Sequence, residues 1–406
     1  MTLLLALFSG SSWAGDWVER WQQRREDRRE NREQRRAKLM NWLEDEEEAG
    51  AGPRSLATED RLGPGAYSVG YTVLEMRVPD HKGETQTVGV AVWYPTKSQP
   101  KPYQYQIAQN QLNSHLALDA KPASGAFPLV IYSHAATGSG LNAIFLTERL
   151  ASEGFVVAAP DYPDEFCAAR ILGPQPRFKL GQRRKMMEWL EDIRDRQLNK
   201  AGKSFRKNLA YRPQQAKKAI DRLLEENRDP KSALNGAIDE NRIGAVGHSF
   251  GAWTSILIGG ADAAFADSRI KAIVALSGPC NDSVYESTEL KNIHVPIMFM
   301  FGSEEPKVGR ASDKVLLYDR ANAPKFLLEV AGSDHFTFSG GIRREYRSPS
   351  EYLEKDGRRA VIVRYTELFL KYYLYEEREA GKQLQYPSPA LVSFTPDFGA
   401  GRPSPD

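Results

Sequence analysis

Cysteine is scarce in this sequence, which has only two, Cys167 and Cys280, in 406 residues. Two cysteines this far apart provide neither the disulfide framework of a small secreted protein nor a cysteine cluster for zinc. The sequence leaves open whether they pair. The fold must therefore depend mainly on a hydrophobic core, for which the chain is long enough.

An excess of one charge is also missing, since 55 Lys and Arg stand against 53 Asp and Glu, a net charge of +2. Without a bulk positive field, we expect no nucleic-acid partner. No apolar stretch approaches the roughly 20 residues that a membrane-spanning helix needs. The sequence therefore favours neither a nucleic-acid-binding protein nor a transmembrane protein.

The first 14 residues resemble a secretory signal peptide. The apolar run from Leu3 to Phe8 precedes small residues at Ser12 and Ala14, the pattern of a cleavage site. A basic segment before the apolar run is missing, so an apolar, frayed N-terminus is the alternative. We expect export, to the periplasm or the medium, with cleavage near Ala14.

Residues 15–53 form a highly charged arm that ends in the linker-like segment Ala49–Pro53. Between Trp21 and Leu39 the arm has no apolar stripe. This pattern indicates a solvated helix or a disordered segment that does not join the core. The alternative role is peripheral contact between the basic side chains of the arm and an anionic membrane surface.

The rest of the chain alternates between strands and helices. Residues 67–78 and 85–94 predict an antiparallel pair of strands. Continuous apolar runs separated by helical segments then indicate a mostly parallel sheet with helices on both faces, as in α/β proteins. These runs are residues 127–132, 154–160, 243–246, 270–276, 295–301 and 325–330. We predict one α/β domain over residues 54–380, followed by a C-terminal tail, residues 381–406.

A long polar stretch interrupts this pattern and predicts a helical insertion at about residues 165–210. Within it, residues 185–198 have helical spacing and would lie above the sheet as a lid or a substrate wall. A second helix, residues 212–227, has an apolar stripe that would pack on the sheet.

The most informative motif is Gly247-His248-Ser249-Phe250-Gly251, the G-x-S-x-G pattern of a nucleophile elbow. An apolar strand precedes it and a helix-like segment follows, which is the context that the motif requires. The two glycines permit close packing at a sharp turn. The pattern predicts Ser249 as a catalytic nucleophile, against the alternative of a Gly-Ser turn between core elements.

A serine nucleophile needs a base, and His335 has the right place among the six histidines. It lies in a loop after a late apolar strand and C-terminal to the serine, as the order Ser, acid, His requires. Two backbone N–H groups must bind the oxyanion, and one of them is that of Phe250, directly after the nucleophile. The second is expected from the small-residue loop Ser133–Gly140, where His134 would organise the loop.

Several segments together resemble the bacterial dienelactone-hydrolase-like serine hydrolases and the platelet-activating-factor acetylhydrolase branch of the α/β-hydrolase superfamily. The segments are Pro128–His134, Leu150–Asp161, Arg212-Pro213, Gly247–Gly251 and Asp334–Phe336. The resemblance extends over residues 67–375 and implies the α/β-hydrolase fold. It implies that the N–H of Ala136 is the second oxyanion donor, although Ala135 stands where the family often has glycine. A serine at position 249 argues against true dienelactone hydrolase activity, which uses cysteine.

The acid of the site has two candidate strand ends. At Ser277 the acetylhydrolase branch would have an aspartate, and this chain offers only serine there, with Asp282 further along. Many α/β-hydrolases instead carry the acid three residues after the glycine that ends the next strand. This spacing selects Glu305, with Glu304 as its neighbouring alternative.

These residues predict a serine hydrolase that cleaves carboxylic esters through an acyl-enzyme and needs neither a cofactor nor a metal. The predicted site consists of Ser249, His335 and Glu305, with oxyanion donors at Ala136 and Phe250. The expected partner is a small-molecule acyl or aryl ester, which includes lipid-derived esters. The alternatives are a non-catalytic binding or scaffold protein on the same fold, and a lipase or amidase with the same site.

Overall fold

The structure is a computed structural model that describes residues 62–80, 82–164, 166–176, 210–280, 284–285, 288–305, 311–340 and 346–401. All of them belong to one compact unit, residues 54–406. The predicted signal peptide, the charged arm, the helix at residues 185–198 and the alternative acid Asp282 lie outside the described residues.

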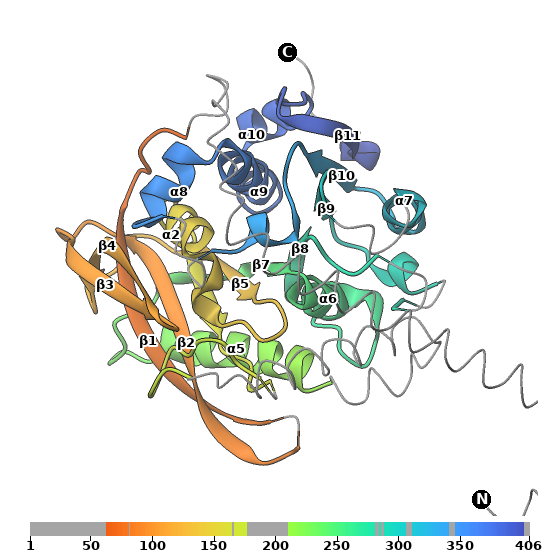
Figure 1. Cartoon of the computed structure of the whole chain (residues 1–406). Coiled ribbons are helices and arrows are strands. Elements are labelled where there is room, and N and C mark those ends of the chain that lie inside the picture. The colour runs from red at the N-terminus through yellow and green to blue at the C-terminus, as the bar shows by residue number, and fades with distance from the viewer. Residues whose placement is uncertain are drawn as a thin grey trace, which may run out of the picture. The chain divides into compact units, whose positions relative to one another are not determined.

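The described residues form an 11-stranded sheet in the order β11-β10-β9-β8-β7-β5-β6-β2-β1-β4-β3 (Figure 1). Its strands are β1 (Ser68–Pro79), β2 (Thr85–Thr96), β3 (Lys101–Ile107), β4 (Asn110–Leu118), β5 (Phe127–Ser133), β6 (Val156–Pro160), β7 (Ile238–His248), β8 (Ile270–Leu276), β9 (Ile297–Gly302), β10 (Lys325–Val330) and β11 (Leu391–Asp397). The helices are α2 (Ile144–Ser152), α5 (Tyr211–Arg228), α6 (Phe250–Ile256), α7 (Ala311–Arg320), α8 (Pro349–Lys355), α9 (Gly357–Tyr375) and α10 (Arg378–Gln383). Shorter helical turns are η2 (Gly140–Ala143), η3 (Leu257–Ala261), η4 (Glu289–Asn292), η5 (His335–Phe338) and η6 (Gly399–Gly401).

The central strands β6, β5, β7, β8, β9 and β10 are parallel to their neighbours in this group. They coincide with the apolar runs of the sequence, and every residue of β5, β6 and β9 is buried. Strands buried on both faces are typical of a parallel sheet between two helical layers. The prediction of a mostly parallel α/β sheet is therefore confirmed.

Two hydrophobic clusters form the core, one on each face of the sheet. The first contains Ile220 of α5 and Trp253 of α6, and the second contains Phe145 of α2 and Phe369 of α9. Figure 1 shows these two pairs of helices on opposite sides of the sheet. The predicted packing of helix 212–227 on the sheet matches α5.

The C-terminal segment differs from the prediction, which placed residues 381–406 outside the domain. Strand β11 pairs antiparallel with β10 at the edge of the sheet. Phe398 is 5% exposed and packs edge-to-face on Phe326 at 4.9 Å between ring centroids. As an edge strand, β11 has only partly buried or exposed residues and includes Pro396, so it lacks the apolar run that marks the central strands.

Because β5, β7, β8, β9 and β10 are parallel, their C-terminal ends all point the same way and lie side by side. Binding sites of open α/β sheets form at these C-terminal strand ends. Five features of the predicted site follow these strand ends: the loop after β5, Ser249 after β7, Ser277 after β8, Glu305 after β9 and His335 after β10. The topology thus gathers the predicted site residues. Among the described residues, no helix is long and apolar enough to cross a membrane.

Candidate active site

Ser249 lies on a strained turn between β7 and α6. Its backbone has φ 55° and ψ −119°, a conformation that a residue other than glycine rarely adopts. A Cβ at Gly247 would overlap the backbone carbonyl of Gly251, and a Cβ at Gly251 would overlap that of Ser133. Both glycines are therefore required by close backbone packing, as expected for a nucleophile elbow.

His335 stands opposite the serine. Its Nε2 atom lies 2.9 Å from Oγ of Ser249, although the two residues are 86 positions apart. His335 begins η5, and the side chain of Asp334 caps this turn by accepting the N–H groups of Phe336 and Thr337 at 3.0 and 2.8 Å. The capped turn thus holds the imidazole within hydrogen-bonding distance of the Ser249 hydroxyl.

The other ring nitrogen of His335 contacts a serine. Nδ1 lies 2.5 Å from Oγ of Ser277, which follows β8 and is 2% exposed. Glu305 has a different contact, because its Oε1 accepts the N–H of Gly302 at 2.7 Å. Among the described residues, the hydrogen-bond partner of Nδ1 is therefore Ser277, and the spacing rule that selected Glu305 did not find it. Glu304 is exposed, and its N–H donates to the carbonyl of Ser333 at 2.8 Å.

Burial lowers the pKa of His335 below its ordinary value, while the negative charges of Glu305 and Asp334 raise it again. The ring of His248 lies 4.8 Å from that of His335. Burial, and then the charge of His335, hold the pKa of His248 well below its ordinary range. Its Nε2 lies 2.8 Å from the carbonyl oxygen of His335, so this nitrogen carries the proton of a neutral ring and donates it. His248 therefore supports the backbone of His335.

The two expected oxyanion donors come from separate elements. Phe250 is the first residue of α6, so its N–H belongs to the positive end of a helix. Ala136 lies in the loop after β5, beside the carbonyl of Ala135 that accepts hydrogen bonds from Gly138 and Arg212. Backbone N–H groups at such places are the donors used in acyl-transfer sites.

A family model for "Platelet-activating factor acetylhydrolase, isoform II" matches residues 103–340, more than half of the chain and a range that includes all the residues above. The chain belongs to this family. It is 29% identical over 228 residues to the platelet-activating factor acetylhydrolase of Cavia porcellus, a match that covers 53% of this chain and 50% of the relative. The chain thus spans about half the length of the curated relative that it matches. The predicted resemblance to the acetylhydrolase branch and the α/β-hydrolase fold are confirmed.

In this member of the acetylhydrolase family, a buried ion pair holds the loop after β5. Arg212 of α5 and Asp164 are paired and buried. Arg212 donates from Nη1 to the carbonyl of His134 at 2.7 Å and from Nη2 to that of Ala135 at 3.1 Å. Asp164 accepts the N–H of Thr137 at 3.1 Å. The pair therefore fixes the backbone on both sides of Ala136, a role that the sequence motif Arg212-Pro213 had not revealed.

His134 organises the same loop, as expected. Its Nε2 accepts the N–H of Tyr162 at 3.0 Å, so its Nδ1 carries the proton and donates to the carbonyl of Ala135 at 2.7 Å. Burial, together with the charge of Arg212, lowers the pKa of His134 to about 3. A ring that stays neutral and has both nitrogens engaged is a structural residue and not a second base.

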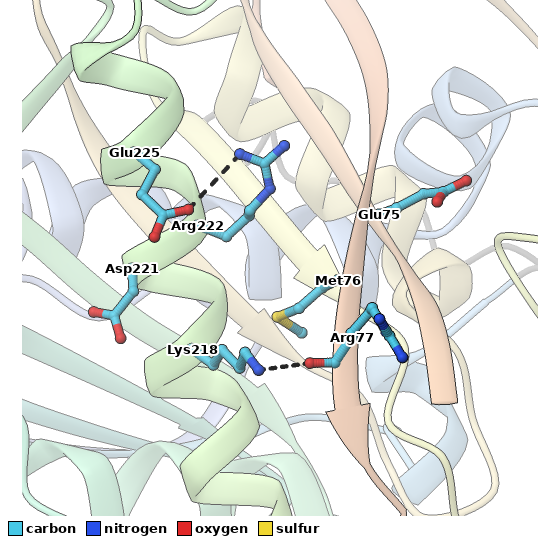
Figure 2. Close-up of a pocket in the computed structure, with 7 residues that line it drawn as sticks. All are labelled: Glu75, Met76, Arg77, Lys218, Asp221, Arg222 and Glu225. Carbon is cyan, nitrogen blue, oxygen red and sulfur yellow. Dashed lines mark hydrogen bonds and ion pairs between the residues drawn. The ribbon is translucent and has the colours of Figure 1, made fainter. Parts of the chain in front are cut away.

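A hollow of about 250 Å³ lies elsewhere, between β1 and α5 (Figure 2). Its lining is mostly charged and consists of Glu75, Met76, Arg77, Lys218, Asp221, Arg222 and Glu225. Lys218 donates to the carbonyl of Arg77 at 2.6 Å, and Arg222 lies 4.0 Å from Glu225, as Figure 2 shows. This hollow shares no residue with the site at Ser249, and its charged lining does not suit an acyl chain. Within the described part of the chain, no three His, Cys, Asp or Glu residues form a group that could hold a metal ion.

Proposed function

We propose that the protein is a serine hydrolase that cleaves carboxylic esters through an acyl-enzyme on Ser249. The observation that carries the proposal is the distance of 2.9 Å between Oγ of Ser249, on its strained turn, and Nε2 of His335. A hydroxyl within hydrogen-bonding distance of an imidazole is the arrangement of an activated nucleophile. Membership of the acetylhydrolase family supports the same chemistry.

In the proposed reaction, neutral His335 takes the proton of Ser249 as the hydroxyl attacks the ester carbonyl. The N–H groups of Ala136 and Phe250 stabilise the oxyanion, and the imidazolium then gives its proton to the leaving alcohol. Water, activated by the same histidine, releases the acid and restores the serine. Glu305 contributes the negative charge that favours the imidazolium, since its carboxylate raises the pKa of His335 against the effect of burial.

The substrate class that we propose is a lipid-derived ester with a short acyl group. The support is the name of the relative from Cavia porcellus, an acetylhydrolase of platelet-activating factor. We expect p-nitrophenyl acetate and butyrate to be hydrolysed with at least about tenfold higher kcat/KM than the palmitate ester, since one misplaced methylene changes binding by roughly 1–3 kcal/mol. A chain-length series from acetate to palmitate measures this. A maximum at palmitate would identify a lipase-like acyl site instead.

A fluorophosphonate probe separates a hydrolase from a non-catalytic scaffold on the same fold. We expect the folded protein to be labelled at Ser249, because only an activated serine reacts quickly with such a probe. Peptide mapping of the labelled protein locates the adduct, and Ser249→Ala provides the unlabelled control. A folded protein that remains unlabelled would favour the scaffold.

We also propose that the protein is exported after cleavage near Ala14 and that residues 16–52 do not take part in folding or catalysis. The support is the apolar run before a small-x-small site and the charged arm without an apolar face. Intact-mass measurement of protein from fractionated host cells should find a chain that starts near Gly15.

Deletion of residues 16–52 should leave esterase turnover within about twofold, whereas insoluble expression would show that the arm packs on the domain.

A further inference from the structure

Ser277 is held at the place where it meets His335 by the backbone of the sheet. Its N–H donates to the carbonyl of Met300 in β9 at 2.7 Å, and the N–H of Ser249 donates to the carbonyl of Leu276 at 2.8 Å. Ser277 also has a positive φ of 44°. The nucleophile and the partner of Nδ1 are therefore anchored on neighbouring strand ends, and the hydroxyl of Ser277 points to the ring at 2.5 Å.

A carboxylate next to Nδ1 performs two tasks in a serine hydrolase. It holds the imidazole in the orientation and tautomer in which Nε2 can accept a proton, and it stabilises the imidazolium that forms. A hydroxyl can accept or donate a hydrogen bond, so it orients the ring but carries no charge to stabilise the cation. Ser277 can therefore perform the first task and not the second.

The negative charge must come from residues that do not bind Nδ1. Glu305 lies at the end of β9, where its Oε1 accepts the N–H of Gly302 at 2.7 Å, and the N–H of the preceding Glu304 donates to the carbonyl of Ser333 in the loop of His335 at 2.8 Å. From this place its negative charge raises the pKa of His335, as does that of Asp334. Asp334 is engaged in capping η5, where it accepts two backbone N–H groups. Among the described residues, His248 also adjoins His335; it is neutral, and its Nε2 faces the carbonyl of His335. Of the carboxylates in the described part of the chain, Glu305 is thus the best placed to supply charge from a distance.

We propose that the work of the triad acid is divided in this protein: Ser277 orients His335 through Nδ1, and Glu305 stabilises the imidazolium through space. This inference rests on the proposed function, because it concerns the base of that reaction. When Nε2 takes the proton of Ser249, Nδ1–H donates to Oγ of Ser277, and the serine keeps its own proton. Ser277 is a positioning residue.

The test uses substitutions at both positions and full pH profiles of kcat/KM with p-nitrophenyl acetate. The base must be neutral, so activity is present above the pKa of His335 and lost below it. Glu305→Gln should lower kcat on the order of a hundredfold and move the acid limb to lower pH, since a charge that raises the pKa is removed. Ser277→Ala should lower kcat about tenfold, the effect of one hydrogen bond, with a smaller shift of the limb.

Ser277→Asp is the decisive variant, because it places orientation and charge in one side chain. We expect kcat at or above that of the wild type and an acid limb about one pH unit higher or more. In the Ser277→Asp background, Glu305→Gln should lower kcat by less than about threefold, compared with on the order of a hundredfold in the wild type. Equal costs of Glu305→Gln in both backgrounds would overturn the division of tasks, as would a Ser277→Ala variant with the wild-type rate and profile.

Thermal unfolding of each variant separates catalytic from folding effects. Ser277→Gly offers a second variant without the hydroxyl, since glycine accepts a positive φ without strain. The matched control is Ser255→Ala in α6, which removes a buried hydroxyl that has no hydrogen-bond partner in the described part of the chain.

Labelling of the wild type by a fluorophosphonate tests the proposed function separately. An unlabelled wild type refutes the hydrolase itself, whereas a labelled wild type with unaffected Ser277 variants refutes only the division.

Discussion

Replacing Ser249 or His335 by alanine should lower kcat by about four orders of magnitude or more, and the double variant should be no slower than the slower single variant. The two side chains meet at 2.9 Å and are expected to act as one unit, so losing either should remove the proposed nucleophile or its base. Residual turnover should come from the oxyanion donors and from substrate binding alone. The measurement is steady-state hydrolysis of p-nitrophenyl acetate by the purified single and double variants.

The interpretation depends on intact folding of each variant. Neither substitution should reduce stability strongly, because both side chains lie at the strand ends and outside the two hydrophobic clusters. Thermal unfolding checks this for all three variants, with Ser255→Ala as the active control. Full activity in either single variant would refute the assignment, and a double variant far slower than both would show that the residues act independently.

The strained turn at Ser249 was predictable from sequence because its geometry is local. A strand, a serine between two glycines and a helix lie within one short segment. A Cβ at Gly247 would overlap Gly251 of the same turn, whereas a Cβ at Gly251 would overlap the carbonyl of Ser133 at the end of β5. The parallel strands were predictable for a similar reason, since burial on both faces leaves continuous apolar runs. The nearness of His335 to Ser249 followed from chain order, because the histidine of such a site comes after the serine, at the end of a later strand.

The partner of Nδ1 was not predictable, because it depends on where side chains from different strand ends point. Counting from Gly302 selects Glu305, but this carboxylate turns back to the N–H of Gly302 in its own strand end. Ser277, at the end of the adjacent β8, reaches the ring instead. The spacing of residues in the sequence does not indicate where either side chain points. Strand β11 was missed for a different reason, since an edge strand with exposed residues carries no continuous apolar run.

The ion pair between Arg212 and Asp164 joins residues 48 positions apart and was likewise hidden from the sequence. Arg212 contacts two elements of the site, the loop after β5 and the first residue of α6. The guanidinium of Arg212 binds the carbonyls on one side of Ala136 and lies 4.4 Å from the ring centroid of Phe250, so both expected oxyanion donors adjoin it. A buried charge with these contacts is expected to matter for both folding and catalysis.

We therefore expect Arg212→Ala to lower the free energy of unfolding by about 3–5 kcal/mol, because it leaves the buried carboxylate of Asp164 without its cation. Urea unfolding followed by circular dichroism measures this. The control is Arg222→Ala in the same helix, where the partly exposed pair with Glu226 should contribute less than about 1 kcal/mol. Similar losses in the two variants would contradict a special role for the buried pair.

Arg212→Lys separates charge from geometry at the same position. Lysine keeps the positive charge that Asp164 needs, but it lacks the planar fork that binds the carbonyls of His134 and Ala135 together. The variant should therefore remain folded while its kcat falls about tenfold or more with a small change in KM, because the loop that carries Ala136 is less well positioned for the transition state. A folded Arg212→Lys variant with wild-type kcat would show that the ion pair stabilises the domain without positioning the oxyanion loop.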